Sequence, residues 1–140
     1  MKLSENFTLE ELTTTSTGLP NIPDVREQEK LLYLCQCILQ PIRDLWGSIT
    51  VTSGFRSWKV NEAIGGAKSS QHLYGEAADI IPQQEKIDDV FRWCINNLKF
   101  GQCIRESKNS KEWIHVSLPR LNKDNQEALI FENGIYRRVV

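Results

Sequence analysis

The sequence predicts one α+β domain, in which a small antiparallel sheet carries helices on one face. Two observations lead to this class. Apolar residues recur at helical spacing in two long segments, and β-branched or apolar residues form several short, strand-like runs. The chain has 140 residues, which suits a single domain over residues 1–140, and 40% of them are hydrophobic, which is sufficient for a core.

The predicted helices alternate with polar or proline-containing segments. Thr8-Leu-Glu-Glu11 matches a capping box, so a short helix is expected to begin there. The longest helical pattern runs from Asp24 to Gly47, and Pro41 inside it is expected to kink or divide the helix. Residues 58–64 are expected to form one or two helical turns, and residues 85–98 to form an amphipathic helix.

The predicted strands are short and rich in β-branched or apolar residues. They cover residues 48–53, 76–81, 100–105, 113–118, 128–131 and 135–140. The polar segment 107–111 is expected to join the third and fourth strands as a hairpin with a longer loop. Asn133-Gly134 separates the last two strands and is typical of a tight hairpin turn.

Charge and hydropathy argue against two classes of partner. The formal net charge is −1, whereas a protein that binds nucleic acid usually presents a basic face. The chain has no run of eighteen apolar residues, so membrane insertion is not expected. The N-terminal segment lacks the apolar stretch of a secretory signal, so we expect synthesis in the cytoplasm without a signal peptide. A monomer is expected.

The four cysteines are Cys35, Cys37, Cys94 and Cys103. They show no C-x-x-C spacing, which a zinc site built from cysteines would favour. We therefore expect buried, reduced cysteines that act as small hydrophobic residues.

The only two histidines of the chain, His72 and His115, suggest a metal site together with Asp79. A hydrolytic zinc site needs three protein ligands and one open position, and two histidines with one carboxylate are a standard set. Taken alone, this signal is weak, because a single histidine on a strand is usually structural and a carboxylate seven positions after a histidine is common by chance.

The full pattern is more specific. The string S-x-H-x-x-G-x-A-x-D over residues 70–79, followed by Trp113-Ile-His115, resembles the signature of the zinc D-Ala-D-Ala carboxypeptidase and L-alanyl-D-glutamate endopeptidase family. The chain is most similar to its small, single-domain members, many of them encoded by bacteriophages. The resemblance extends to residues 6–12, residues 51–57 and the terminal hairpin, and it implies a Hedgehog/DD-peptidase-like fold.

The resemblance also implies roles for individual residues. His72, Asp79 and His115 match the ligands of one zinc ion per chain, and Glu112 matches the glutamate that acts as general base in several relatives. Arg56 matches an arginine that binds a substrate carboxylate or the developing oxyanion.

Glu106 is an alternative general base, because it ends the preceding strand and small relatives often carry a glutamate there. Strict alternation along a strand would point Glu112 away from the face of His115, so a bulge or loop would have to turn it back. The resemblance favours Glu112 over Glu106 as the general base.

The substrate-binding residues also have structural alternatives. Arg56 could instead form a surface ion pair with Asp44 or Glu62. Gln71 and Tyr74 are candidates to line the substrate cleft, although Tyr74 could equally be half-buried packing.

The resemblance implies a zinc metallopeptidase that hydrolyses peptide bonds of peptidoglycan stem peptides. D-Ala-D-Ala carboxypeptidase and L-Ala-D-Glu endopeptidase activities both fit, and the sequence leaves open which bond is cut. The alternative is a catalytically silent wall-binding or virion module that retains a zinc site. Action on the cell wall fits a phage endolysin released through a holin pore, a phage structural component or a cytoplasmic product of prophage origin.

Overall fold

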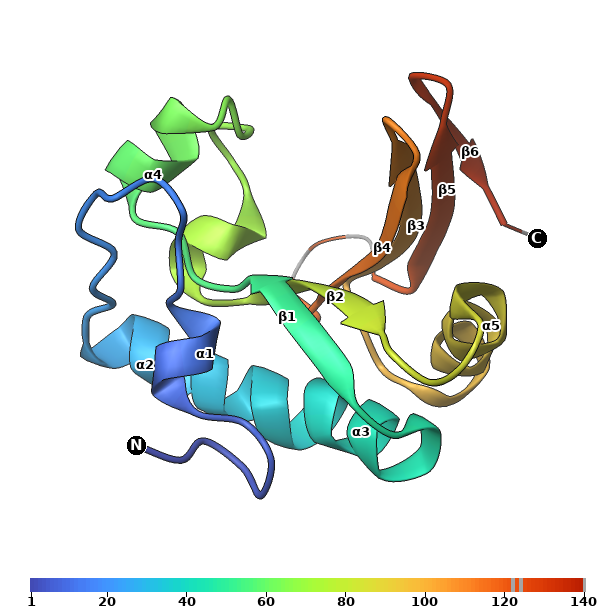
Figure 1. Cartoon of the computed structure of the whole chain (residues 1–140), viewed down its shortest axis with the longest axis horizontal. Coiled ribbons are helices and arrows are strands. Elements are labelled where there is room, and N and C mark those ends of the chain that lie inside the picture. Colours follow the sequence, from blue (N-terminus) through green and yellow to red (C-terminus); the bar gives the residue numbers. More distant parts are fainter. Residues whose placement is uncertain (122, 124, 140) are drawn as a thin grey trace.

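Within the described residues 1–121, 123 and 125–139 of the computed structural model, six strands form one sheet, and the main helices lie together against one face of it (Figure 1). The helical elements are α1 (Leu9–Leu12), α2 (Val25–Leu34), η1 (Cys35–Leu39), α3 (Gln40–Trp46), α4 (Trp58–Ala63), η2 (Gln71–Tyr74) and α5 (Ile87–Asn97). The strands are β1 (Ile49–Ser53), β2 (Ala77–Pro82), β3 (Gln102–Lys108), β4 (Lys111–Ser117), β5 (Glu127–Glu132) and β6 (Ile135–Arg138). The predicted α+β class is confirmed.

The sheet is mixed rather than purely antiparallel, which corrects one feature of the prediction. Its strand order is β1-β2-β4-β3-β5-β6, and β3 pairs with β5 in parallel while the other neighbours are antiparallel. The reason is where β5 begins. Strand β4 ends beside the start of β3, and β5 begins at the same edge of the sheet, on the other side of β3. Strand β5 therefore runs opposite to β4 and in the same direction as β3.

The two faces of the sheet have different partners. Ile80, Ile114 and Val116 are fully buried in the core that the sheet shares with α2, α3 and α5. Asp79 and His115 alternate with these residues along β2 and β4, so they face the opposite side of the sheet. The helices therefore stabilise one face and leave the other available for a site.

The long helical segment is divided, as Pro41 predicts. Between α2 and α3 the segment η1 is a π-helix, in which the Gln40 N–H donates to the Cys35 carbonyl. Pro41 follows directly, near the start of α3. A proline has no N–H to donate and crowds the preceding turn, so a widened turn before it accommodates the ring.

The hairpin between β3 and β4 is tighter than predicted. The strands continue to Lys108 and from Lys111, so only Asn109 and Ser110 form the turn, and both have positive φ, at 53° and 63°. Such a two-residue turn keeps regular pairing up to the turn. The β5–β6 hairpin turns at Asn133-Gly134 as predicted, and the predicted end at Val140 lies outside the described residues.

The cysteines are free in the described part of the chain. Cys35, Cys94 and Cys103 are buried as predicted, whereas Cys37 is exposed. Cys37 lies two residues after Cys35 on the helical segment, which turns its side chain toward solvent. In the described range, the helices are too short or too polar to span a membrane.

Candidate metal centre

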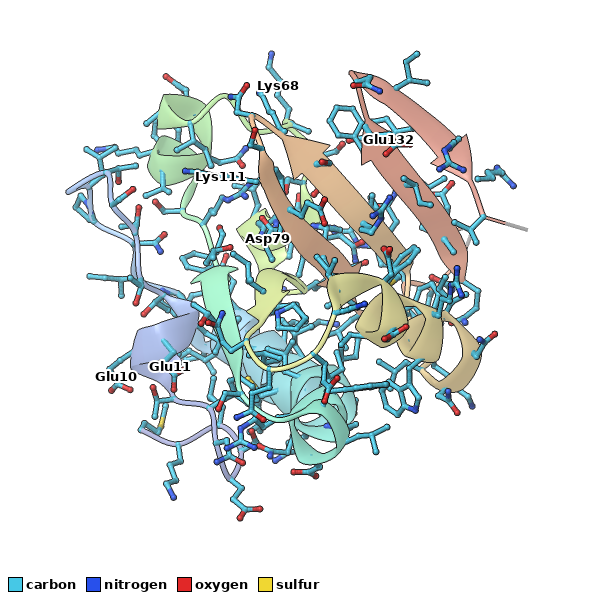
Figure 2. All side chains as sticks on the ribbon, turned by 45° about the vertical axis from the view of Figure 1, so that its right-hand side comes forward. Glu10, Glu11, Lys68, Asp79, Lys111 and Glu132 are labelled. Carbon is cyan, nitrogen blue, oxygen red and sulfur yellow. The ribbon has the colours of Figure 1, made fainter. Side chains whose placement is uncertain are left out.

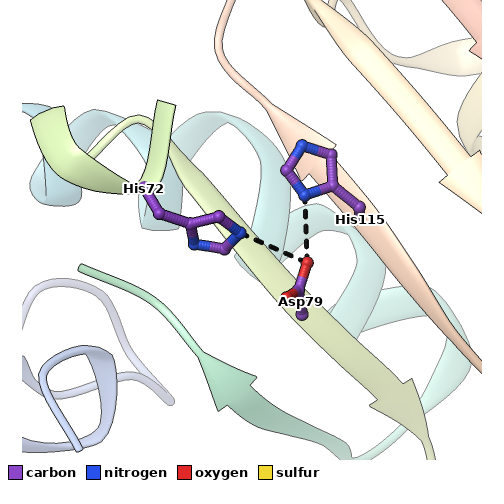
Figure 3. Close-up of side chains that lie close together, drawn as sticks. All are labelled: His72, Asp79 and His115. Carbon is purple, nitrogen blue, oxygen red and sulfur yellow. Dashed lines mark hydrogen bonds and ion pairs between the residues drawn. The ribbon is translucent and has the colours of Figure 1, made fainter. Parts of the chain in front are cut away.

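Three potential metal ligands from three elements converge on the face opposite the helices. His72 comes from η2, while Asp79 of β2 and His115 of β4 are direct partners across the sheet. Figure 3 shows both imidazole rings turned toward the Asp79 carboxylate. Asp79 Oδ1 lies 3.0 Å from His115 Nδ1 and 3.4 Å from His72 Nε2. The ligand atoms of the three residues all lie within 4.8 Å of one another.

Asp79 lies near the middle of the molecule, whereas Glu10 and Lys68 lie at its margin (Figure 2). Burial alone would raise the pKa of Asp79. The proximity of His72 and the hydrogen bond with His115 outweigh burial and hold this pKa below its usual range. The carboxylate is therefore ionised, which is the state in which it can bind a cation.

A backbone contact orients the ring of His72. Its Nδ1 lies 2.7 Å from the carbonyl oxygen of Gly54. A carbonyl only accepts, so Nδ1–H donates this bond and leaves Nε2 facing Asp79. Burial of the ring lowers the pKa of His72, which favours the neutral form. A neutral imidazole with its second nitrogen bound to the backbone is the usual arrangement of a metal-binding histidine.

Two glycines allow the backbone around His72 to pack closely. Gly75 ends η2 with a φ of 72°, and a Cβ there would lie 2.5 Å from the carbonyl oxygen of Glu27. A Cβ on Gly54 would overlap the backbone and side chain of Leu12. A larger residue at either position would displace the segment that holds His72 in place.

Arg56 belongs to this centre and not to the surface. Its Nη2 lies 3.3 Å from Asp79 Oδ2, Nε donates to Ser53 Oγ at 2.9 Å, and Nη1 donates to Asn61 Oδ1 at 3.3 Å. Its backbone N–H also donates to the carbonyl of His72 at 3.0 Å. The alternative ion pairs with Asp44 or Glu62 are replaced by the pair with Asp79.

A bulge in β1 brings Ser53 into this network. Val51 pairs with Ile80 but Ser53 pairs with Asp79, so Thr52 is an extra residue in β1. The extra residue turns Ser53 to the face of Asp79, where it accepts from Arg56. No local pattern in residues 48–53 indicates this bulge, and Ser53 and Asn61 were not predicted as partners of Arg56.

A cavity of about 600 Å³ opens beside the three ligands. Residues that line it include Arg56, Gln71, Ile104, Glu106, Trp113 and Tyr136, together with His72, Asp79 and His115. Two imidazoles and a carboxylate are the donor set of hydrolytic zinc sites, which keep one position open for the reaction. The donor set, the orientation of His72 and the adjoining cavity together fit one metal ion.

Glu106 lies in this cavity, whereas Glu112 does not line it. Strands β3 and β4 pair without a register shift from Cys103–Val116 to Lys108–Lys111, so the expected bulge is not found in these two described strands. Glu106 is paired with Trp113, and both lie on the face of His115. Glu112 is exposed and points to the other face.

The environment of Glu106 also differs from that of a surface carboxylate. Trp113 Nε1 donates to Glu106 Oε2 at 2.7 Å. Burial raises the pKa of Glu106, and the negative charge of Asp79 raises it further. The role of Trp113 was not predicted, although its position two residues before His115 places both on one face of a strand.

Gln71 and Tyr74 lie in different places. Gln71 lines the cavity, and its Nε2 donates to the Leu118 carbonyl at 3.0 Å. Tyr74 is half exposed and lines a neighbouring cavity, where the Arg120 guanidinium lies over its ring. Of the two predicted cleft residues, Gln71 is therefore the one that the structure brings to the metal ligands.

Two comparisons with known proteins show what this chain is similar to. Residues 5–117 match the model of a family described as peptidase M15. A stretch of 44 residues is 50% identical to the zinc D-Ala-D-Ala carboxypeptidase of Streptomyces albus G. This stretch covers 30% of the chain but only 17% of that enzyme.

Proposed function

The chain belongs to the peptidase M15 family, and from this premise we propose that it is a zinc-dependent metallopeptidase that hydrolyses peptide bonds in peptidoglycan stem peptides. The observation that carries the proposal is the convergence of His72, Asp79 and His115 beside an open cavity. The short similarity to a zinc D-Ala-D-Ala carboxypeptidase supports both the metal and the class of substrate.

In this proposal His72, Asp79 and His115 hold one zinc ion. When bound, zinc supplies Lewis acidity, which makes water more acidic and polarises the carbonyl of the scissile bond. His72 is aligned for this task by Gly54, and Asp79 is aligned by Arg56. These two contacts orient His72 and Asp79 before a metal ion binds. A ligand that already makes a hydrogen bond or an ion pair to the protein does not have to reorient on binding the metal.

We assign the general base to Glu106 in place of Glu112. Glu106 would take a proton from the attacking water and return it to the leaving amine. Its position in the cavity and its raised pKa support this assignment, because a base whose pKa is nearer to neutral can also act as an acid. Trp113 fixes one carboxylate oxygen and leaves the other for the proton transfer.

We assign Arg56 mainly to the support of Asp79. Each of its three side-chain nitrogens already donates to Ser53, Asn61 or Asp79. Its positive charge remains beside the reacting carbonyl and could stabilise the developing oxyanion. A ground-state carboxylate would have only the two N–H groups of Arg56 that these three contacts leave.

The proposal is tested on purified sacculi. The zinc-loaded protein is expected to release peptide fragments with new amino and carboxyl ends, which mass spectrometry identifies. Release of D-Ala would identify a carboxypeptidase, and a new end between L-Ala and D-Glu would identify an endopeptidase. A protein that holds zinc and binds sacculi without cutting any bond would instead be a silent wall-binding or virion module.

Replacing Arg56 by Lys is expected to lower kcat/KM about 10- to 100-fold and to weaken zinc binding, as loss of an outer contact to a metal ligand does. A lysine keeps the charge, but its single nitrogen cannot replace contacts to Ser53, Asn61 and Asp79 together. Steady-state kinetics and chelator competition measure the two effects.

The matched control is Arg92→Lys, because Arg92 is an exposed arginine of α5 on the helical side. It should behave as the unchanged protein. If Arg56→Lys shows the same kcat/KM and zinc affinity as this control, the network around Asp79 does not support the ligand.

A further inference from the structure

A second cavity, of about 470 Å³, adjoins the one at the metal ligands. Ser69, Arg120 and Lys123 line both cavities, so these residues mark the passage between them. The other residues of the second cavity include Lys30, Tyr74 and Glu76. A peptide that occupies the first cavity could therefore extend into the second.

Arg120 is held rigidly at this passage. Its Nε donates to Glu76 Oε1 at 2.8 Å, and its guanidinium carbon lies 5.2 Å from the centre of the Tyr74 ring. Glu76 itself is only 8% exposed and lies in the chain directly before β2, which carries Asp79. A guanidinium fixed on one edge and one face loses little further entropy when it binds a ligand.

The charges at the passage favour an anion. Glu76 is the buried carboxylate here, and it faces Arg120 and also Lys30, whose Nζ lies 3.6 Å from Glu76 Oε2. Among the described residues, three cationic side chains, including Lys123, line the second cavity together with this one carboxylate. Within that set, positive charge remains after Glu76 is paired.

Arg120 and Arg56 differ in what they can still bind. All three side-chain nitrogens of Arg56 donate within the protein. Arg120 uses Nε, while its Nη1 and Nη2 have no protein partner among residues 1–121, 123 and 125–139. The paired terminal nitrogens of a guanidinium match the two oxygens of a carboxylate.

We propose that Arg120, assisted by Lys123, is a subsite that binds a free carboxylate of the peptide substrate next to the metal centre. This inference rests on the proposed function, because it takes the stem peptide as the ligand. A stem peptide offers two such groups. One is its C-terminal carboxylate, and the other is the carboxyl group that a glutamyl residue leaves outside the peptide bond.

The test is equilibrium binding of three stem peptides to the zinc-loaded protein, with both candidate bonds N-methylated to prevent cleavage. The first peptide carries both carboxylates, the second has the glutamyl carboxylate amidated, and the third has the C-terminus amidated. We expect the unchanged protein to bind one of the amidated peptides about 10- to 100-fold more weakly than the first. The peptide that is weakened identifies the carboxylate.

Arg120→Gln is expected to bind all three peptides with similar affinity. Because this change leaves Glu76 without its arginine, the double variant Glu76→Gln/Arg120→Gln repeats the test without a buried unpaired carboxylate. Lys123→Gln keeps the Glu76–Arg120 pair and should lose part of the discrimination. Arg92→Gln on α5 removes the same charge far from the cavity and should discriminate as the unchanged protein does.

Two results would overturn the subsite. One is an unchanged protein that binds all three peptides equally, and the other is a folded double variant that still discriminates fully. Cleavage of sacculi together with either result would leave the proposed function standing. Discrimination that depends on Arg120, in a protein that cuts no sacculi, would support the subsite and contradict the peptidase.

Discussion

Replacing Asp79 by Ala is expected to abolish tight zinc binding and, with it, peptidase activity. Loss of an outer partner of a metal ligand typically weakens binding about 10- to 100-fold, so loss of a ligand should exceed that range. Asp79 is also the residue that both histidines and Arg56 contact. Its removal therefore leaves two histidines without the anion between them and a partly buried arginine without its ion pair.

Elemental analysis after dialysis measures the effect, with about one zinc expected per unchanged chain and almost none per variant. His72→Ala and His115→Ala should give the same result. Asp89→Ala, which removes an exposed carboxylate in the first turn of α5, is the control for a change of one charge. Circular dichroism verifies that each variant is folded. A folded Asp79→Ala protein with full zinc would disprove this set of ligands.

Stability offers a second measurement of the same centre. A metal that binds only the folded chain raises its stability by about 4 kcal/mol when its concentration is 1,000 times Kd. Chelation should therefore lower the Tm of the unchanged protein but not that of Asp79→Ala. This comparison does not depend on any peptidase substrate.

The candidate ligands were predicted from the resemblance of the motif over residues 70–79 and of Trp113-Ile-His115, and local rules account only for the face on which Asp79 and His115 lie. Asp79 and His115 lie on strands whose alternation sets which side chains share a face, and His72 lies only seven residues before Asp79. The division of the helix at Pro41 and the final hairpin at Asn133-Gly134 also follow from local chemistry. Local signals were sufficient for the division of the helix and for the final hairpin.

The relation of the two glutamates to His115 depends on the hairpin between β3 and β4, which the sequence predicted less well. A longer loop over residues 107–111 was expected, and such a loop could have turned Glu112 toward His115. The two-residue turn at Asn109 and Ser110 instead extends both strands and keeps their alternation regular. Alternation alone then separates Glu112 from the face of His115 and brings Glu106 to it.

Other features depend on contacts between residues far apart in the chain. Glu76 and Arg120 are 44 residues apart and meet only after β2 and β4 pair. The bulge at Thr52 is defined by the pairing of Ser53 with Asp79, which lies 26 residues later in the chain. Parallel pairing of β3 with β5 likewise depends on the path of a connection that carries no directional signal. No local pattern predicts such contacts.

Replacing Glu106 by Gln is expected to lower kcat about 10²- to 10⁴-fold, which is the usual contribution of a general base. Glutamine keeps the size of the side chain and can still accept the hydrogen bond from Trp113, but it cannot take a proton. Zinc content and Tm should stay close to those of the unchanged protein, because Glu106 is not among the proposed ligands. Turnover of a stem-peptide substrate at saturating concentration measures the loss.

Glu112→Gln is the matched control, because it makes the same chemical change on the neighbouring strand, at an exposed position that points away from His115. It is expected to keep nearly normal kcat. Trp113→Phe should fall between the two, since it removes the indole N–H that holds Glu106 but leaves the carboxylate in the cavity. The loss of activity in Trp113→Phe should appear in kcat more than in KM, because this change misplaces the base Glu106 and not the substrate. The opposite order, with Glu112→Gln inactive and Glu106→Gln active, would mean that the hairpin rearranges when substrate binds and that Glu112 is the base.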